Sequence, residues 1–155
     1  MLEIRRATPN DGQVAFDIRL QAIRSQCIGA YTEEQMLAWT RGSAEDGYGA
    51  LMDKHFYLGC IEGEEVATGM LDLDNDEVGA LFVLPGFIGR GIGKKILAHL
   101  ESLARELGLK KVILDATLNA GDFYRRCGYT GSEKAIYHSP SGLQLACIPM
   151  VKSLL

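Results

Sequence analysis

The sequence predicts an α/β (α+β) fold, with a mixed β-sheet of about seven strands and helices on both of its faces. Segments with the alternation or the short apolar runs of strands are interspersed with segments whose apolar residues recur every three or four positions, as in helices. Hydrophobic residues make up 47% of the chain and charged residues 23%, which is typical of globular proteins. With 155 residues, the chain is expected to form one domain over residues 1–155.

The expected strands are recognised by alternating or β-branched apolar residues. They are residues 2–7, 55–61, 66–74, 78–83, 112–116, 129–137 and 143–151. Residues 62–65 are polar and contain a glycine, so they predict a hairpin turn, and Ser139-Pro140-Ser141-Gly142 predicts a second one. The run 112–116 is mostly apolar, which predicts a strand that is buried on both faces.

The expected helices are recognised by apolar periodicity and by capping residues. They are residues 14–23, a segment beginning after Thr32, residues 92–107 and residues 119–127. Thr32 is followed three residues later by Gln35, which is a capping box, and Gly108 predicts the end of the long third helix. Residues 42–49 are expected to be a loop.

Charge and composition exclude several classes of function. A net charge of −4 argues against nucleic acid as the main partner, because binding to phosphates needs a basic surface. No apolar run approaches the roughly 20 residues of a membrane span, and the N-terminus has no apolar signal core. The four cysteines are widely separated, so we expect neither a metal site nor a disulfide framework, and a cytoplasmic location.

The segment LFVLPGFIGRGIGKKIL predicts a strand, a glycine-rich turn and the start of a helix. Gly89, Gly91 and Gly93 leave backbone N–H groups unshielded, and the first turn of a helix adds free donors at a positive dipole end. No acidic residue lies between positions 78 and 100, whereas Arg90 and Lys94 are basic. The sequence therefore predicts an anion site suited to the oxygens of a pyrophosphate.

Two well-known phosphate-binding loops do not match this turn. A dinucleotide-binding fingerprint that starts at Gly89 requires glycine where Lys94 stands. A P-loop requires glycine at position 88 and Ser or Thr at position 95, and the chain has Ile88 and Lys95. At this point a glycine-rich turn without any ligand also remains open.

The same residues resemble the acetyl-CoA-binding segment of the GNAT superfamily of N-acetyltransferases. This resemblance rests on F-V-x-P followed by G-R-G-I-G-K-K-I-L, and on a second block, A-T-L-N-A … F-Y-R-R-C-G-Y, over residues 116–129. The order of elements also matches, and residues 31–39 are similar to a stretch in small bacterial members. One position departs from the family pattern: Ile88 replaces the usual Arg or Gln three residues before the second glycine of the turn, which removes a polar contact.

The resemblance implies where acetyl-CoA would bind. Strands 78–83 and 112–116 would splay apart and take the pantetheine arm between them, with backbone groups of Leu81, Phe82 and Val83 facing its amides. The residues implied to hold the pyrophosphate or the arm are Gly89, Arg90, Gly91, Ile92, Gly93, Lys94, Asn119 and Tyr124.

The resemblance also implies two catalytic residues. Tyr124 occupies the position of the family's usual hydrogen-bond donor to the leaving thiolate. Because a tyrosine has a pKa near 10 and a thiol near 8.5, full proton transfer is unfavourable by about 2 kcal/mol, so a strengthening hydrogen bond is expected instead. Glu77, at the start of the strand, is the candidate base for the amine, with an exposed turn acid as the alternative; Asp72 and Asp74 come next, and many relatives use a water relay.

The acidic run between Lys54 and Arg90 bears on the acceptor. It contains no Lys or Arg but includes Glu62, Glu64, Glu65, Asp72, Asp74, Asp76 and Glu77. One interpretation is that part of this run faces the acceptor site and favours a cationic amine, and the other is a solvated hairpin edge. The expected function is acetyl transfer to a primary amine of a small molecule.

The remaining expectations concern alternative functions and partners. A non-catalytic acyl-CoA-binding module remains the alternative function, and a toxin-type enzyme acting on charged tRNA would need a basic surface that the net charge does not supply. Residues 129–151 are expected to form a terminal hairpin, whose edge could pair between subunits in a homodimer. No membrane partner is expected.

Overall fold

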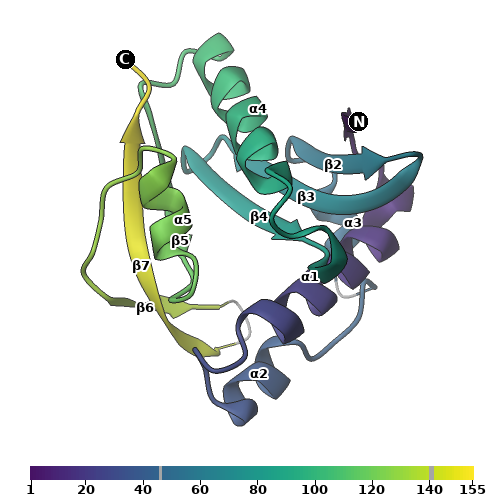
Figure 1. Ribbon diagram of the computed structural model, residues 1–155, viewed down its shortest axis with the longest axis vertical. Coiled ribbons are helices and arrows are strands. Elements are labelled where there is room, and N and C mark those ends of the chain that lie inside the picture. Colours follow the sequence, from purple (N-terminus) through teal and green to yellow (C-terminus); the bar gives the residue numbers. More distant parts are fainter. Residues whose placement is uncertain (46, 140–141) are drawn as a thin grey trace.

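The computed structural model describes residues 1–45, 47–139 and 142–155 of the chain. Within these residues, one mixed sheet has seven strands in the order β1-β2-β3-β4-β5-β7-β6 (Figure 1). The strands are β1 (Leu2–Arg6), β2 (Phe56–Ile61), β3 (Glu64–Asp72), β4 (Glu77–Val83), β5 (Lys111–Ala116), β6 (Ala135–His138) and β7 (Gln144–Ser153). The predicted sheet of about seven strands is thus confirmed.

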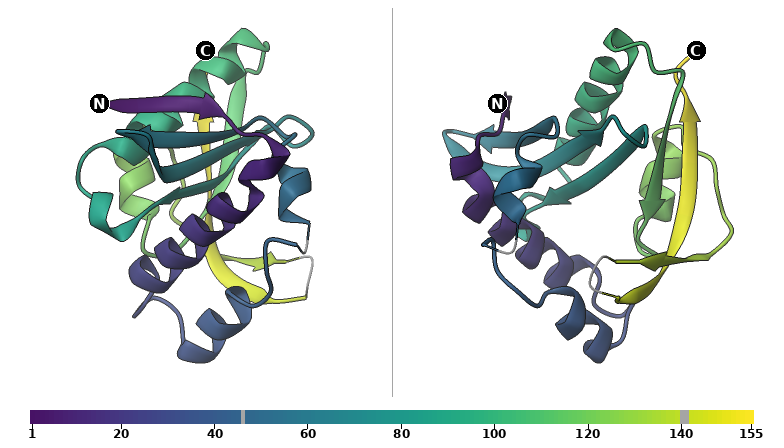
Figure 2. Two further views of the ribbon diagram at one scale, coloured as in Figure 1. Left: turned by 90° about the vertical axis from the view of Figure 1, so that its right-hand side faces the viewer. Right: turned by 180° about the vertical axis from the view of Figure 1, so that it is seen from behind.

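Helices cover both faces of the sheet. They are α1 (Gly12–Gln26), α2 (Glu33–Trp39), α3 (Tyr48–Leu51), α4 (Ile92–Glu106) and α5 (Gly121–Arg126), with short 3-10 turns η1 (Pro9–Asp11) and η2 (Pro85–Phe87). Ile96, Leu97 and Leu100 of α4 are buried in the larger apolar core, on one face of β3 and β4. Helix α1 packs on the other face of the same strands, against a smaller core that includes Ala15 and Phe56 (Figure 2).

The sheet opens between its two central strands. β4 and β5 are parallel, and among the described residues they pair only at Glu77 and Ile113. Beyond this pair the two strands diverge, so that β1–β4 and β5–β7 form two separate wings (Figure 1). Backbone groups along the rest of β4 therefore lack a strand partner on the β5 side.

A β-bulge in β4 was not predicted from the sequence. Thr68 pairs with Phe82 and Met70 with Gly79, so that Gly69 lies opposite two residues, Ala80 and Leu81. Ala80 adopts a left-handed backbone with φ of 51°, and its carbonyl accepts a 2.6 Å hydrogen bond from the Thr68 hydroxyl. Because of this extra residue, the side chains before and after Ala80 do not follow one regular alternation between the two faces of the sheet.

Several element boundaries differ from the prediction. The strand expected over 129–137 is replaced by the shorter β6. Thr130 forms a single bridge with Val151, and the strand is then interrupted at Gly131, which has a φ of 146°. Helix α3 lies partly in the segment expected to be a loop.

The capping box of α2 is confirmed: the Gln35 backbone N–H donates to the Thr32 hydroxyl, and the Thr32 backbone N–H donates to the Gln35 side chain. Residues 140 and 141 of the predicted last turn lie outside the described residues.

Strand β5 corrects the prediction of burial on both faces. Val112, Leu114 and Ala116 are buried, whereas Lys111 and Asp115 are exposed. The strand has an apolar core face and a second face that carries charge. The apolar run of the sequence conceals this difference because Ile113 lies on the second face.

Other structural findings bear on expected partners. No helix in residues 1–45, 47–139 and 142–155 has both the length and the apolar character needed to cross a membrane. All four residues of the edge strand β6 are exposed. The pairing between subunits expected at this edge stays a prediction.

Replacing Gly69 with Ala is expected to destabilise the fold. A Cβ atom at position 69 would lie 2.5 Å from Ile96 Cγ2 and 3.1 Å from Leu100 Cδ1, which is overpacking of a full core. We expect the free energy of unfolding to fall by about 1–3 kcal/mol in urea denaturation. Gly86→Ala is the control, because its Cβ would meet nothing within 4 Å. Equal stability of the two variants would contradict the close packing of α4 on β3.

Candidate active site

A cavity of about 370 Å³ lies at the opening between β4 and β5. Its walls come from α1, the segment around α2, β4, β5, the start of α5 and the β6–β7 hairpin. Of the residues predicted from the sequence, Glu77, Leu81, Phe82, Asn119 and Tyr124 line this cavity. Residues far apart in the chain are thus brought together around one space.

One edge of β4 is open toward this cavity. The Leu84 N–H donates to the Val66 carbonyl on β3. In an antiparallel ladder the backbone groups of successive residues point to opposite sides. The backbone groups of Phe82 therefore also point toward β3, and those of Val83 point to the β5 side. Leu81 is two residues earlier and shares this direction. The Val83 carbonyl accepts a 2.9 Å hydrogen bond from the Gln26 side chain of α1. Of the three predicted residues, Leu81 and Val83 thus direct their backbone toward the β5 side, and Phe82 directs its backbone toward β3.

The bulge sets the direction of these groups. Val78 and Val83 both lie in the core beneath α4, although they are five positions apart in the chain. Regular alternation would place the two side chains on opposite faces of the sheet. The extra residue at Ala80 restores a common face, and the groups of Leu81 and Val83 consequently point into the opening.

The glycine-rich turn leads into α4 at the far end of β4. Gly89 and Gly91 have φ of 83° and 75°, and a Cβ at either position would meet nothing within 4 Å, so their backbone is open to approach. Gly91 is the N-cap of α4, and the N–H groups of Ile92, Gly93 and Lys94 lie in its first turn. The Ile92 side chain is buried in the core, so only its backbone is available there.

This turn lies close to Phe123 of α5 and Val83 of β4, which are the sequence neighbours of the lining residues Tyr124 and Phe82. A Cβ at Gly93 would be 3.4 Å from the Phe123 ring of α5 and 3.7 Å from Val83. The Arg90 guanidinium lies 4.9 Å from the centre of the Phe87 ring. Ile88 is 51% exposed and has no polar group to offer, as the sequence indicated.

Aromatic packing holds the Tyr124 ring in place. Its ring makes edge-to-face contacts with Phe123 at 5.1 Å and with Tyr129 at 5.7 Å. Among the described residues, none forms a hydrogen bond with its hydroxyl, and burial raises the pKa of Tyr124 above its ordinary value. A phenol of raised pKa donates a hydrogen bond but gives up its proton less readily.

A buried ion pair fixes Tyr129 and therefore supports Tyr124. The Tyr129 hydroxyl donates to Glu101 at 2.8 Å, and Lys152 donates to the other Glu101 oxygen at 2.9 Å. Lys152 also donates to the Cys127 carbonyl at 2.8 Å. The network joins α4, α5 and β7 behind the cavity.

Glu77 carries a carboxylate into the cavity. Burial raises the pKa of Glu77, and the negative charges of Asp115 and Asp72 raise it further. Asp115, on the charged face of β5, also lines the cavity and was not predicted as a site residue. The signal was available, because an acidic residue interrupts an otherwise apolar strand.

The acidic run contributes less than expected. Of its seven members only Glu77 lines the cavity. Asp72 accepts hydrogen bonds from the Asp74 amide and from the Asn75 side chain, in the turn between β3 and β4. Asp72 and Asp74 therefore do not line this cavity, and β3, which was expected to reach Asp74, ends at Asp72.

Further lining residues come from the N-terminal helices and the last hairpin. They are, among others, Arg19, Tyr31, Trp39, Tyr48 and Tyr137. The Tyr31 hydroxyl donates to the Ala146 carbonyl at 2.6 Å and accepts from the Leu118 amide at 3.1 Å, one residue before Asn119. The sequence had marked residues 31–39 only as a similar stretch, without a role.

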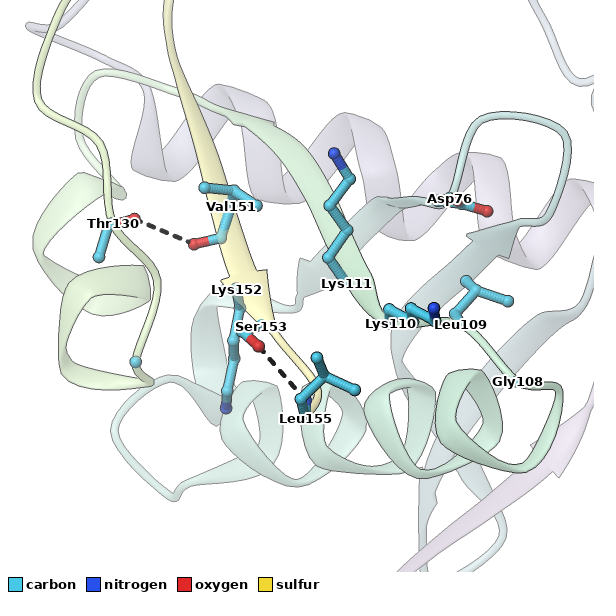
Figure 3. Close-up of a pocket in the computed structure, with 11 residues that line it drawn as sticks. Asp76, Gly108, Leu109, Lys110, Lys111, Thr130, Val151, Lys152, Ser153 and Leu155 are labelled. Atoms are coloured by element: carbon cyan, nitrogen blue, oxygen red, sulfur yellow. Dashed lines mark hydrogen bonds between the residues drawn. The ribbon is translucent and has the colours of Figure 1, made fainter.

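A wider surface hollow of about 1010 Å³ lies elsewhere, near the start of β5 (Figure 3). Lys110, Lys111 and Lys152 line it, together with Asp76 and Thr130. Lys152 is already paired with Glu101. None of the residues that the sequence marked as site residues lines this hollow, so we assign the chemistry to the smaller cavity.

Comparison with known proteins gives the family. The acetyltransferase (GNAT) family matches residues 18–129. An aminoglycoside N(6′)-acetyltransferase type 1 from Stenotrophomonas maltophilia is 25% identical over 86% of this chain and 90% of its own. A probable glucosamine 6-phosphate N-acetyltransferase 2 from rice is 41% identical over 51 residues, which span only 32% of this chain and 31% of that protein.

Solved structures have the same fold. A GCN5-related N-acetyltransferase from Rhodopseudomonas palustris has a TM-score of 0.89 at 27% identity, covering 97% of this chain and 94% of that one. The PaiA N-acetyltransferase from Thermoplasma acidophilum, solved in complex with coenzyme A, has a TM-score of 0.74 at 16% identity over 99% of both chains. With the divergent central strands and the glycine-rich turn, these matches show that the chain belongs to the GNAT family and is a GNAT N-acetyltransferase.

Proposed function

We propose that this chain transfers the acetyl group of acetyl-coenzyme A to the primary amine of a small molecule by direct attack. One observation carries the proposal: Leu81 on the open edge of β4 and Tyr124 line one cavity, and the glycine-rich turn that follows β4 lies close to Phe123, the neighbour of Tyr124 in α5. The relatives named above support the donor and the type of acceptor, because one was solved with coenzyme A and another is named for an aminoglycoside.

The residues present fit coenzyme A in chemical character. Leu81 and Val83 would pair with the amides of the pantetheine arm along the open edge of β4. The backbone of Gly89–Gly93, Lys94 and the first turn of α4 would bind the pyrophosphate, with Arg90 adding positive charge. Asn119, beside the Tyr31–Leu118 hydrogen bond, would contact the arm from the β5 side.

Gly91→Val is expected to weaken cofactor binding. Valine is strained at a φ of 75°, and its side chain would stand between the phosphate and the backbone donors. We expect the KM for acetyl-coenzyme A to rise about tenfold with a smaller change in kcat, measured by initial rates. Gly108→Val, at a φ of 84° beyond the other end of α4, carries similar strain without a phosphate site. An equal rise in KM for both variants would contradict the assignment.

The chain's own residues would carry the proton steps. Bound acetyl-coenzyme A supplies a thioester, whose carbonyl carbon accepts the amine nitrogen and whose C–S bond then breaks to leave a thiolate. Tyr124 would donate a hydrogen bond to the sulfur, and this bond strengthens as negative charge develops. Glu77 would accept a proton from the amine, directly or through a water molecule, and its raised pKa makes it a better base.

A thiol-release assay tests the proposal. Acetyl-coenzyme A is incubated with the protein and with amines, peptides and aminoglycosides, and the free thiol and the N-acetyl product are measured together. We expect equal amounts of both with at least one acceptor class. Thermal stabilisation by coenzyme A, with no thiol release on any amine, would support the non-catalytic binding module instead.

A further inference from the structure

Arg19 is a cation that lines the cavity, and none of the residues that the structure describes gives it an anionic partner. It projects from α1, it is half-buried, and one of its nitrogens donates to the Trp39 carbonyl at 3.0 Å. Its guanidinium lies 5.7 Å from the centre of the Phe16 ring. Among the described residues, no carboxylate lies within 4.0 Å of it. A guanidinium has five N–H donors, and within residues 1–45, 47–139 and 142–155 the Trp39 carbonyl is the one acceptor found for them.

This arrangement is costly unless a ligand completes it. Burial lowers the pKa of Arg19, which reflects the loss of water around the charge. Buried charges are normally paired, so an anion bound in the cavity would compensate Arg19 for the hydration that partial burial removes. The carboxylates of the cavity, Glu77 and Asp115, do not serve as its partner.

Tyr137 lies between the two kinds of charge. Burial raises the pKa of its phenol, the negative charges of Glu77 and Asp115 raise it further, and the positive charge of Arg19 opposes them. All four residues line the same cavity. The cavity thus has the carboxylates of Glu77 and Asp115 on its β4 and β5 walls and the Arg19 guanidinium on its α1 wall. Charges of both signs act on Tyr137.

On the basis of the proposed function, we infer that the acceptor is an amine that also carries an anionic group, which Arg19 binds. The amine would lie at the Glu77 and Asp115 end, where it is deprotonated and attacks. Carboxylate and phosphate both match the planar fork of a guanidinium. The acceptor is then an amino acid or an amino sugar phosphate rather than a simple amine.

Matched pairs of acceptors test this inference. One pair is an amino acid and its carboxamide, and the other is an amino sugar phosphate and its unphosphorylated sugar. We expect kcat/KM for thiol release to favour the anionic member of one pair by about tenfold or more, and the pair that responds identifies the anion. Arg19→Gln is expected to abolish this preference. Arg24→Gln, an exposed position on the same helix, is expected to keep it.

The outcomes separate the inference from the proposed function. Equal use of both members in both pairs, or an undiminished preference in Arg19→Gln, would overturn the inference while leaving acetyl transfer intact. If no amine is acetylated, the proposed function fails, and the inference is then tested by calorimetric binding of the same pairs. Tighter binding of the anionic members that Arg19→Gln removes supports the inference. Equal binding of both members refutes it. Arg19→Lys, which keeps the charge but not the fork, serves if Arg19→Gln does not fold, and a reduced preference is then expected.

Discussion

Replacing Glu77 with Gln is expected to lower kcat/KM at least about 100-fold at neutral pH, the scale of losing a general base. The base must be deprotonated to act, so the rate of the native enzyme should rise with pH through the pKa of Glu77. Because burial and the charges of Asp115 and Asp72 raise this pKa, the acidic limb should lie above the ordinary glutamate value of 4.5. Initial rates of thiol release across pH measure both effects.

Two further variants make the Glu77 prediction specific. Asp115→Asn removes a negative charge that raises the pKa of Glu77, so the acidic limb of kcat, measured at saturating amine, should move to lower pH. Glu64→Gln, an exposed position in the same acidic run, should change neither the rate nor the profile. A Glu77→Gln enzyme with native activity and an unchanged acidic limb would assign the proton transfer to water alone.

Tyr124→Phe is expected to lower kcat by roughly 10- to 150-fold, which corresponds to about 1.5–3 kcal/mol for a hydrogen bond to a charged group. The KM for acetyl-coenzyme A should change little, because the hydroxyl acts as charge develops on sulfur and not in binding. The raised pKa of Tyr124 argues for this donor role and against full proton transfer. Rates under saturating acetyl-coenzyme A separate the two parameters.

The control for Tyr124 is a second phenol outside the cavity. Tyr57 on β2 makes an edge-to-face contact with His99, with ring centres 4.6 Å apart, and does not line the cavity. Tyr57→Phe should leave kcat unchanged. Turnover of Tyr124→Phe at the native rate would refute the proposed stabilisation of the leaving group.

Features with a local physical cause could be predicted from the sequence. The capping box of Thr32 and Gln35 depends only on residues three apart, and the end of α4 near Gly108 depends on a left-handed glycine. The glycine-rich turn was recognised for the same reason. Its neighbour in space, Phe123, was found through a second sequence block, since no local rule connects positions 93 and 123.

Features that depend on long-range packing could not be predicted. The bulge at Ala80 places a non-glycine residue in a left-handed conformation, which only the pairing with β3 and the Thr68 hydrogen bond impose. The proposed acceptor side of the cavity joins Arg19, Asp115 and Tyr137 from three distant segments. Their charges are individually ordinary in the sequence, and their combination arises only in the folded chain.

Backbone hydrogen exchange during titration with coenzyme A tests the proposed cofactor site most directly. The amides of Leu81 and Val83 and those of residues 89–94 should gain protection, because the arm and the pyrophosphate would bind them. The Phe82 amide already bonds toward β3 and should change little. Protection confined to the hollow around Lys110 and Lys111, or binding of coenzyme A with no change at Leu81 and Val83, would contradict the assignment of the site.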